Sequence, residues 1–284
     1  MQFLESKNIV RKNLLSSESG FTLMEIIMVI VILGVLGIVG ADFISQMFRG
    51  FADTNTRLDM YEEGKSALVR MERELHGMLP NAICVTNDQG ANCVNGNNPG
   101  NEIRFGMIAE DTMRTNSMVG GYTEQPIDFP QTVPGTLTDT NPASTPPVSG
   151  VVSIYNTSWA TFVGGARLFS ITGVTGAEMI FGGQTITNPS PQQRYYVMDR
   201  TVSYRYNIGT NTLLRSVTTV GSGGVGNFAL STEYPLARDV SAFDFYYTAP
   251  SLSRNGIISV VFTMSKENGL NLVMHKEIHV KNVP

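Results

Sequence analysis

Residues that commonly carry chemistry are scarce in this sequence of 284 residues. It contains three histidines, two cysteines and one tryptophan, and charged side chains make up only 15% of it. The sequence has no G-x-S-x-G element, no phosphate-binding P-loop and no Cys-His arrangement that would activate a nucleophile. These absences argue against an enzyme.

The sequence also has no large excess of either positive or negative charge. The formal net charge is −4, and without the first twenty residues, which hold three basic and two acidic side chains, it is −5. No basic patch would attract the phosphates of a nucleic acid. Because 42% of the residues are apolar, the composition is that of a globular protein with a core, and we expect no nucleic-acid partner.

The longest apolar run covers residues 21–41 and has one charged side chain, Glu25. As an α-helix with about 1.5 Å per residue it would span about 31 Å, the thickness of the hydrocarbon layer of a membrane. Basic residues precede the run and an acidic one follows it: Lys7, Arg11, Lys12 and Asp42. The positive-inside rule therefore predicts a single-pass inner-membrane protein with a cytoplasmic N-terminus and a periplasmic head.

An ionisable residue inside such a run raises the free energy of membrane insertion by up to about 3 kcal/mol at mid-bilayer, and it usually has a function. The residues Ser19-Gly20-Phe21-Thr22-Leu23-Met24-Glu25, followed by an apolar helix, resemble the prepilin motif G-F-T-L-x-E of type IV pilins and type II secretion pseudopilins. The resemblance implies that residues 1–20 are a leader, which a prepilin peptidase removes by cutting between Gly20 and Phe21. The new amine of Phe21 would then be N-methylated.

The resemblance further implies that Glu25 pairs with the terminal amine of a neighbouring subunit during assembly. Opposite charges attract strongly in lipid or in a filament core, and a subunit out of register would leave both unpaired. Glu25 would thus set the register. The partners implied are the prepilin peptidase, the inner membrane and other pilins, which contact the N-terminal helix before and within an extracellular filament.

Two other interpretations of the N-terminus are open. In one, the run is an ordinary secretory signal that is cut after Val39-Gly40-Ala41, although such a signal has no use for Glu25. In the other, the run is a plain anchor and the match at residues 20–25 is accidental. Small residues at helical spacing would in either case let a second helix approach closely: Gly34, Gly37 and Gly40.

Residues 42–79 predict an amphipathic continuation of this helix, which Pro80 ends. The apolar face that we expect to pack on a sheet consists of Met47, Phe51, Leu58, Tyr61, Leu68, Met71, Leu75 and Leu79. Most charged residues would lie on other faces, and His76 would lie on the surface.

Residues 80–284 predict a β-rich head. Segments 201–207 and 212–218 flank a turn, segments 257–265 and 270–280 flank the hairpin signal Asn268-Gly269, and alternating aromatic residues around Phe245 indicate another strand. We therefore expect an α+β fold in which a long N-terminal helix packs on an antiparallel sheet. Residues 129–149, which are rich in proline, and Gly221–Gly224 predict surface loops.

Cys84 and Cys93 lie close together in a segment rich in Asn and Gly. They are typical of a small loop closed by a disulfide in an oxidising compartment, with two buried thiols as the alternative. The same segment is rich in side-chain oxygens that could bind calcium, although Asn more often stabilises turns. These residues are Asn87, Asp88, Asn92, Asn95, Asn97, Asn98, Asn101 and Glu102.

A metal site on the last strand is the other candidate. His275, Glu277 and His279 alternate and would share one face of that strand. Leu272, Met274, Ile278 and Val280 would form the opposite, inward face, which makes a solvated outer face the better interpretation. No further ligand is evident, so we expect neither a metal nor a cofactor.

Three segments beyond the leader resemble minor pilins, namely residues 64–75, 194–199 and 202–206. The nearest families are the MshO proteins of mannose-sensitive haemagglutinin (MSHA) pili and the related GspJ minor pseudopilins of type II secretion. The two cysteines lie just after the helix, whereas major pilins pair theirs near the carboxyl end. This difference also favours a minor subunit. The alternatives are a secretion pseudopilin and a filament-displayed adhesin with Tyr155, Trp159 and Phe162 as its contact surface.

Overall fold

A computed structural model describes residues 20–87, 92–94, 96–109, 135–138, 150–176, 178–182, 186, 188, 190–191, 195–219, 232–250, 255–266 and 269–280. The leader before Gly20, most of residues 129–149 and the loop Gly221–Gly224 lie outside this range. The chain divides into two compact units, Met1–Asn55 and Thr56–Pro284, which are described separately.

One helix crosses the boundary between the units, and the strands all follow it. The elements are α1 (Leu23–His76), β1 (Met78–Thr86), β2 (Gly96–Gly100), β3 (Glu102–Ile108), β4 (Thr136–Thr138), β5 (Gly150–Ile154), α3 (Trp159–Val163), β6 (Leu168–Ile171), β7 (Gly173–Thr175), β8 (Glu178–Ile180), β9 (Tyr195–Asn207), β10 (Thr212–Thr219), β11 (Glu233–Ala237), β12 (Val240–Thr248), β13 (Gly256–Ser265) and β14 (Asn271–Val280).

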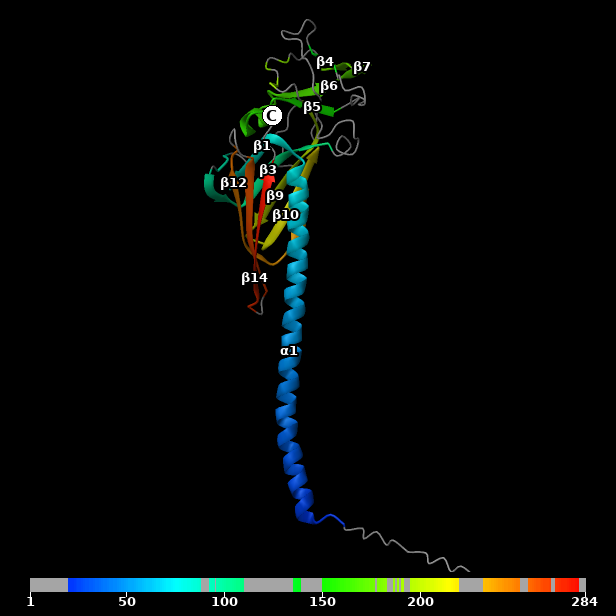
Figure 1. The fold of residues 1–284 in the computed structure, drawn as a ribbon, viewed down its shortest axis with the longest axis vertical. Coiled ribbons are helices and arrows are strands. Elements are labelled where there is room, and N and C mark those ends of the chain that lie inside the picture. Colours follow the sequence, from blue (N-terminus) through cyan, green and yellow to red (C-terminus); the bar gives the residue numbers. More distant parts are fainter. Residues whose placement is uncertain are drawn as a thin grey trace, which may run out of the picture. The chain divides into compact units, whose positions relative to one another are not determined.

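The described strands of the second unit form three antiparallel sheets (Figure 1). The largest has the order β1-β3-β9-β10-β11, with β5 paired to the first part of β9 and β6 paired to β5. A second sheet has the order β14-β13-β12-β2, and a small third one has the order β4-β8-β7. The predicted α+β class is therefore confirmed.

Both predicted hairpins are present. Strand β9 pairs with β10 from Asn207 opposite Thr212 onward, and β13 pairs with β14 along their whole length. Gly269, in the turn between β13 and β14, has φ +81°, a conformation that glycine adopts without steric cost. The strand expected around Phe245 is β12, in which Phe243 and Phe245 are buried.

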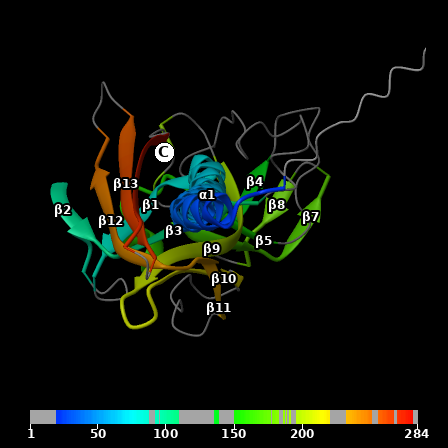
Figure 2. The same cartoon turned by 90° about the horizontal axis from the view of Figure 1, so that it is seen from below.

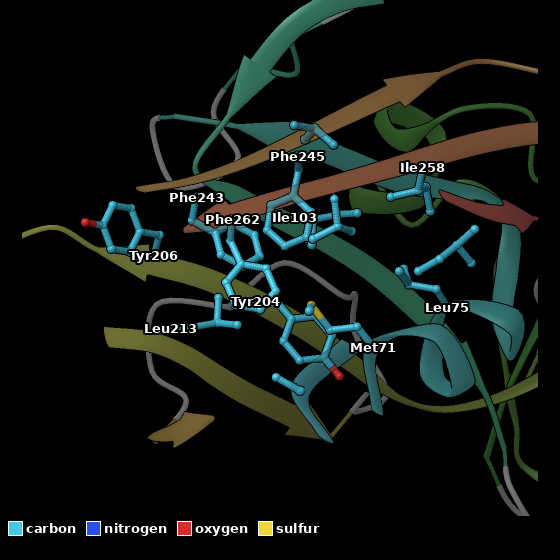
Figure 3. Close-up of a cluster of buried hydrophobic side chains, with 14 of the residues drawn as sticks. Met71, Leu75, Ile103, Tyr204, Tyr206, Leu213, Phe243, Phe245, Ile258 and Phe262 are labelled. Carbon is cyan, nitrogen blue, oxygen red and sulfur yellow. The ribbon is translucent and has the colours of Figure 1, made fainter. Parts of the chain in front are cut away.

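The main core of the second unit lies between the last turns of α1 and the two larger sheets. Figure 2, viewed along α1, shows strands of both sheets around the helix, and Figure 3 shows Met71 and Leu75 directed towards Tyr204 and Ile103. The helix comes close to the sheet at Gly64, where a Cβ would lie 2.2 Å from the terminal carbon of Met274. A small residue at this point therefore allows close packing.

The buried face of α1 differs from the predicted one. It consists of Met60, Gly64, Ala67, Met71, Glu74 and Leu75, whereas Leu58 and Tyr61 are about half exposed, at 53% and 48%. The predicted apolar residues are mostly three or four positions apart. A line of residues with this spacing shifts by about 20° around a straight helix for every seven residues. It therefore reaches the core only at its end, where Met71 and Leu75 are buried as expected.

The end of the helix was also predicted wrongly. Helix α1 ends at His76, and Pro80 lies within β1 instead of terminating the helix. The pairing of β1 with β3 is irregular between Met78 and Ile83, and proline is tolerated at such an irregularity because no ladder hydrogen bond is lost. Asn81, next to this proline, has φ 59°, which asparagine adopts more readily than most residues.

The proline-rich segment is not wholly a surface loop. Four of its residues, 135–138, are described, and Thr136–Thr138 forms β4, which pairs with β8. Leu137 is buried in a second apolar cluster together with Phe169, Phe181 and Tyr195. The expectation of a loop outside the core is therefore wrong for this part.

A buried carboxylate joins α1 to the largest sheet. Glu74 accepts hydrogen bonds from Arg215 on β10, at 2.8 Å (Nη2 to Oε1) and 3.0 Å (Nε to Oε2), and from the hydroxyl of Tyr204 on β9. Arg70 lies one helical turn away, with its Nε 3.3 Å from Oε1. This network gives the helix a fixed position on the sheet because a misplaced helix would leave buried charges unpaired.

The network determines the ionisation of Glu74. Burial raises the pKa of this carboxyl, but the hydrogen bonds from Arg215 and Tyr204 and the charges of Arg215 and Arg70 outweigh it, so the pKa lies below its ordinary value. Burial and the neighbouring carboxylate raise the pKa of the Tyr204 hydroxyl. Tyr204 therefore stays a donor and Glu74 an acceptor.

We predict that Glu74→Gln lowers the free energy of unfolding by about 3 kcal/mol, because it leaves the guanidinium of Arg215 without its counter-ion. The measurement is urea unfolding of the full chain in detergent micelles, followed by the fluorescence of Trp159. Glu233→Gln is the matched control, since its pair with Arg205 is partly exposed, at 36% for Glu233 and 29% for Arg205, and its loss should cost less than about 1 kcal/mol.

The difference between wild type and Glu74→Gln should also depend on pH. Because the folded pKa of Glu74 lies below the unfolded value near 4.5, its contribution is complete above that pH and is lost as the pH falls through the folded pKa. The stability difference should be largest at neutral pH and shrink below pH 4.5. A constant difference across this range would contradict the assigned network.

Candidate functional site

The beginning of α1 contains the residues that resemble the prepilin motif. Gly20, Phe21 and Thr22 precede the helix, which begins at Leu23. The backbone N–H of Glu25 donates to Thr22 Oγ1 at 3.3 Å and to the Thr22 carbonyl at 3.1 Å. Thr22 is thus the N-cap, and its side chain satisfies a donor that the first helical turn would otherwise leave unpaired.

Glu25 is the third residue of this helix, and it is exposed. The spacing Thr22-x-x-Glu25 is that of a capping box, and a carboxylate in the first turn is favoured by the helix dipole. Sequence reasoning assigned Glu25 an intermolecular role and missed the role of Thr22, although the T-x-x-E pattern was a readable signal. The local structure therefore presents an accessible carboxylate at a well-defined helix start.

The side chains that follow Glu25 are apolar and exposed on all sides of the helix. From Phe21 to Val39 each large apolar side chain is between 47% and 79% exposed. Of the described helices, α1 is the one long and apolar enough to span a membrane, and none of its most apolar stretch is buried. Such a surface requires lipid or other apolar helices around it.

The cysteine prediction is confirmed: Cys84 and Cys93 form a disulfide. Cys84 is buried in β1, and a backbone hydrogen bond of 2.8 Å joins Val94 N–H to the Val85 carbonyl beside it. The disulfide therefore attaches the segment leading to β2, a strand of the second sheet, to the first strand of the largest sheet.

Two described residues of the oxygen-rich loop have side-chain partners within the protein. Asn87 accepts from Asn101 N–H at 2.8 Å and donates to the Pro99 carbonyl at 3.2 Å, which is the turn-stabilising role of asparagine. Glu102 is buried and paired with Arg104, Oε1 to Nε at 2.6 Å. Burial raises the pKa of Glu102 more than Arg104 lowers it. Asp88 and Asn95 lie outside the described residues.

The predicted outer face of the last strand is present. His275, Glu277 and His279 are exposed on one face of β14, opposite the buried Met274, Ile278 and Val280, as predicted. His275 Nε2 lies 2.8 Å from the Ser259 hydroxyl. Among the described residues no group of three His, Cys, Asp or Glu side chains could hold a metal ion. His76 is exposed, as expected.

Of the three aromatic residues expected in the contact surface of an adhesin, one is buried and two are partly buried. Phe162 is fully buried, next to Gly106 and Met198, and Trp159 packs against it with ring centroids 5.4 Å apart. Tyr155 is partly buried, with the guanidinium of Arg167 5.9 Å from its ring centroid. Phe162 is therefore a core residue, and its assignment to a surface was wrong.

Comparisons with protein-family models, characterised proteins and solved structures gave no match. The functional assignment therefore depends on the chain's own residues. Those that the structure places at one accessible position are Thr22 and Glu25 at the start of the apolar helix, next to Gly20 and Phe21.

We predict that removing the disulfide, by Cys84→Ala with Cys93→Ala, lowers the free energy of unfolding by about 2–3 kcal/mol, the loop-closure entropy of a short loop. The measurement is urea unfolding of the full chain in detergent micelles. Wild type with a reductant should show a loss of similar size, and the reductant should leave the double variant unchanged. A reductant effect on the double variant would assign the loss to another cause.

Proposed function

We propose that this protein is a minor pilin-like structural subunit of a type IV pilus, of the MSHA type, that acts in pilus assembly, priming or tip formation. The observation that carries the proposal is the accessible carboxylate of Glu25 in the first turn of an exposed apolar helix, five residues after Gly20. A minor pseudopilin of type II secretion would use the same leader and helix, and the head segments nearest to MshO proteins favour the pilus.

The apolar helix determines where the subunit can go. Moving a large apolar side chain from water to an apolar environment is worth about 1.5–3 kcal/mol, so exposure of this surface to water would cost on the order of tens of kcal/mol. The subunit must therefore pass from lipid directly to a bundle of similar helices. A filament that grows at the membrane from pilin-like subunits meets this requirement.

The two ends of the motif then have separate tasks. The basic leader stays in the cytoplasm, the peptidase cuts after Gly20, and the amine of Phe21 is methylated at the start of the helix. That amine remains cationic, and in an apolar bundle it needs a carboxylate partner. Glu25 of the adjacent subunit supplies one, and because each subunit carries the amine and the carboxylate only four residues apart, about one helical turn, their pairing fixes the axial position of the incoming subunit.

We predict that the protein extracted from cells begins with N-methylated Phe21. Intact-mass measurement with sequencing of the N-terminal peptide separates three outcomes. A chain that begins at Asp42 would indicate an ordinary signal peptide, and one that retains residues 1–20 would indicate a plain anchor. Either result would overturn the proposal. Gly20→Leu should block cleavage and leave the leader attached, because the cut follows this glycine.

We predict that Glu25→Ala leaves the amount of protein in the membrane unchanged and lowers its incorporation into filaments at least tenfold. The physical reason is that a lone cation in an apolar bundle costs several kcal/mol. Incorporation is measured as the subunit found in sheared filaments relative to membranes. Asp42→Ala, which removes another exposed carboxylate from the same helix, is the matched control and should incorporate normally. Normal incorporation of Glu25→Ala would contradict the proposed role.

A further inference from the structure

Strand β2 closes one edge of the sheet β14-β13-β12-β2 (Figure 2). It pairs with β12 at two positions, with Gly100 opposite Phe245 and Gly96 opposite Tyr247. Without β2, strand β12 would be an edge strand, and its backbone N–H and C=O groups on that side would be unpaired. The position of β2 therefore decides whether β12 lies inside its sheet or at the edge.

Strand β2 is bound to the rest of the head mainly through its backbone. The described residues of the main core include none from β2, and Asn98 and Pro99 are exposed. The Asn87 side chain accepts a hydrogen bond from Asn101 N–H at 2.8 Å and donates one to the Pro99 carbonyl at 3.2 Å. Fixing the backbone of a residue costs at least as much free energy as one hydrogen bond typically returns, and the cost is highest for glycine, which stands at both ends of β2. Without a covalent link, β2 would therefore be weakly bound.

The disulfide between Cys84 and Cys93 supplies such a link. Cys84 belongs to β1, Cys93 lies shortly before β2, and the Val94 N–H between them and β2 donates to the Val85 carbonyl at 2.8 Å. The link keeps the start of β2 beside β1 and so raises its effective concentration at the edge of β12. At the other end of β2, Gly100 lies so close to β1 that a Cβ would be 2.5 Å from Val85 Cγ1.

We infer that this disulfide is a redox-controlled clamp, whose reduction releases β2 from β12 while the two larger sheets stay folded. The β1–β3 and β12–β13 ladders and the described main core do not contain β2, so they keep their contacts when it leaves. Segments with few buried apolar contacts open locally before the rest of a protein does. The inference goes beyond the proposed filament role and does not depend on it.

The reductant is a dithiol, which acts by thiol–disulfide exchange. Its thiolate attacks Sγ of Cys93, which is partly exposed, whereas Cys84 is buried at 1% exposure. The bond between the two cysteines breaks, a mixed disulfide forms at Cys93, and Sγ of Cys84 leaves as a thiolate that takes up a proton. The second thiol of the reductant then displaces Cys93. Two electrons and two protons thus pass to the chain, which gains two thiols, and the dithiol becomes a disulfide.

Hydrogen–deuterium exchange of the full chain in detergent micelles, read by mass spectrometry, tests the release. Reduction with dithiothreitol should speed exchange about tenfold for the amides on the β2 side of β12, and it should change β13 and β14 by less than about twofold. Cys84→Ala with Cys93→Ala should exchange at the reduced rate with or without dithiothreitol. Unchanged exchange in β12 would overturn the inference. An equal acceleration in all three strands would also overturn it, because the head would then open as a whole.

A second variant separates the docking of β2 from the disulfide itself. Gly100→Val places a Cβ 2.5 Å from Val85 Cγ1 and 2.9 Å from the Thr86 carbonyl oxygen, so β2 cannot dock closely although both cysteines remain. With its disulfide verified by intact mass after thiol alkylation, this variant should show the fast β12 exchange that reduction causes in the wild type. Gly209→Val is the matched control, since a Cβ there meets only Asn207 Oδ1, at 3.4 Å, and it should exchange like the wild type. If β12 stays protected in Gly100→Val, its protection does not come from β2 and the clamp is wrong.

Discussion

The apolar surface of the N-terminal helix is the constraint on which the rest of this protein depends. From Leu23 to Val39 the side chains are exposed on every side of the helix, and the described part of the first unit offers nothing to cover them. This helix is long and apolar enough to span a membrane, where lipid or neighbouring helices would supply the contacts that it lacks.

The head is built around the last five turns of α1 by a combination of apolar and polar contacts. Met60, Gly64, Ala67 and Met71 provide the apolar contacts, and Gly64 lets the helix come close to Met274. Such contacts are not directional. Glu74, bound to Arg215 and Tyr204, adds a directional contact, which specifies one rotation of the helix on the sheet because any other would leave charges buried and unpaired.

The sequence was sufficient to predict the features with strong local signals. Alternation and turn residues identified the β9–β10 and β13–β14 hairpins, and the outward face of His275, Glu277 and His279 followed from the same alternation. The burial of Glu74 could not be predicted, since its partners are 130 and 141 residues away along the chain. The end of α1 was misplaced because Pro80 is a common helix terminator, yet here it occupies an irregular strand.

The face of α1 that was predicted to be buried is not the one that packs on the sheets. The line through Met47, Phe51, Leu58 and Tyr61 was taken for core because apolar side chains at helical spacing usually are. The structure buries a different line, 60-64-67-71, and leaves Leu58 and Tyr61 about half exposed.

The start of the helix connects these observations with the proposed assembly. If the mature chain begins at Phe21, its cationic amine lies at the positive end of the helix dipole, which disfavours a cation there. Thr22 caps the N–H of Glu25, and among the described residues no hydrogen bond or ion pair occupies the Glu25 carboxylate, which is therefore available to neutralise an amine. A carboxylate at this position therefore offsets an unfavourable charge created by the cleavage itself, and a chain that kept its leader would have no such charge to offset.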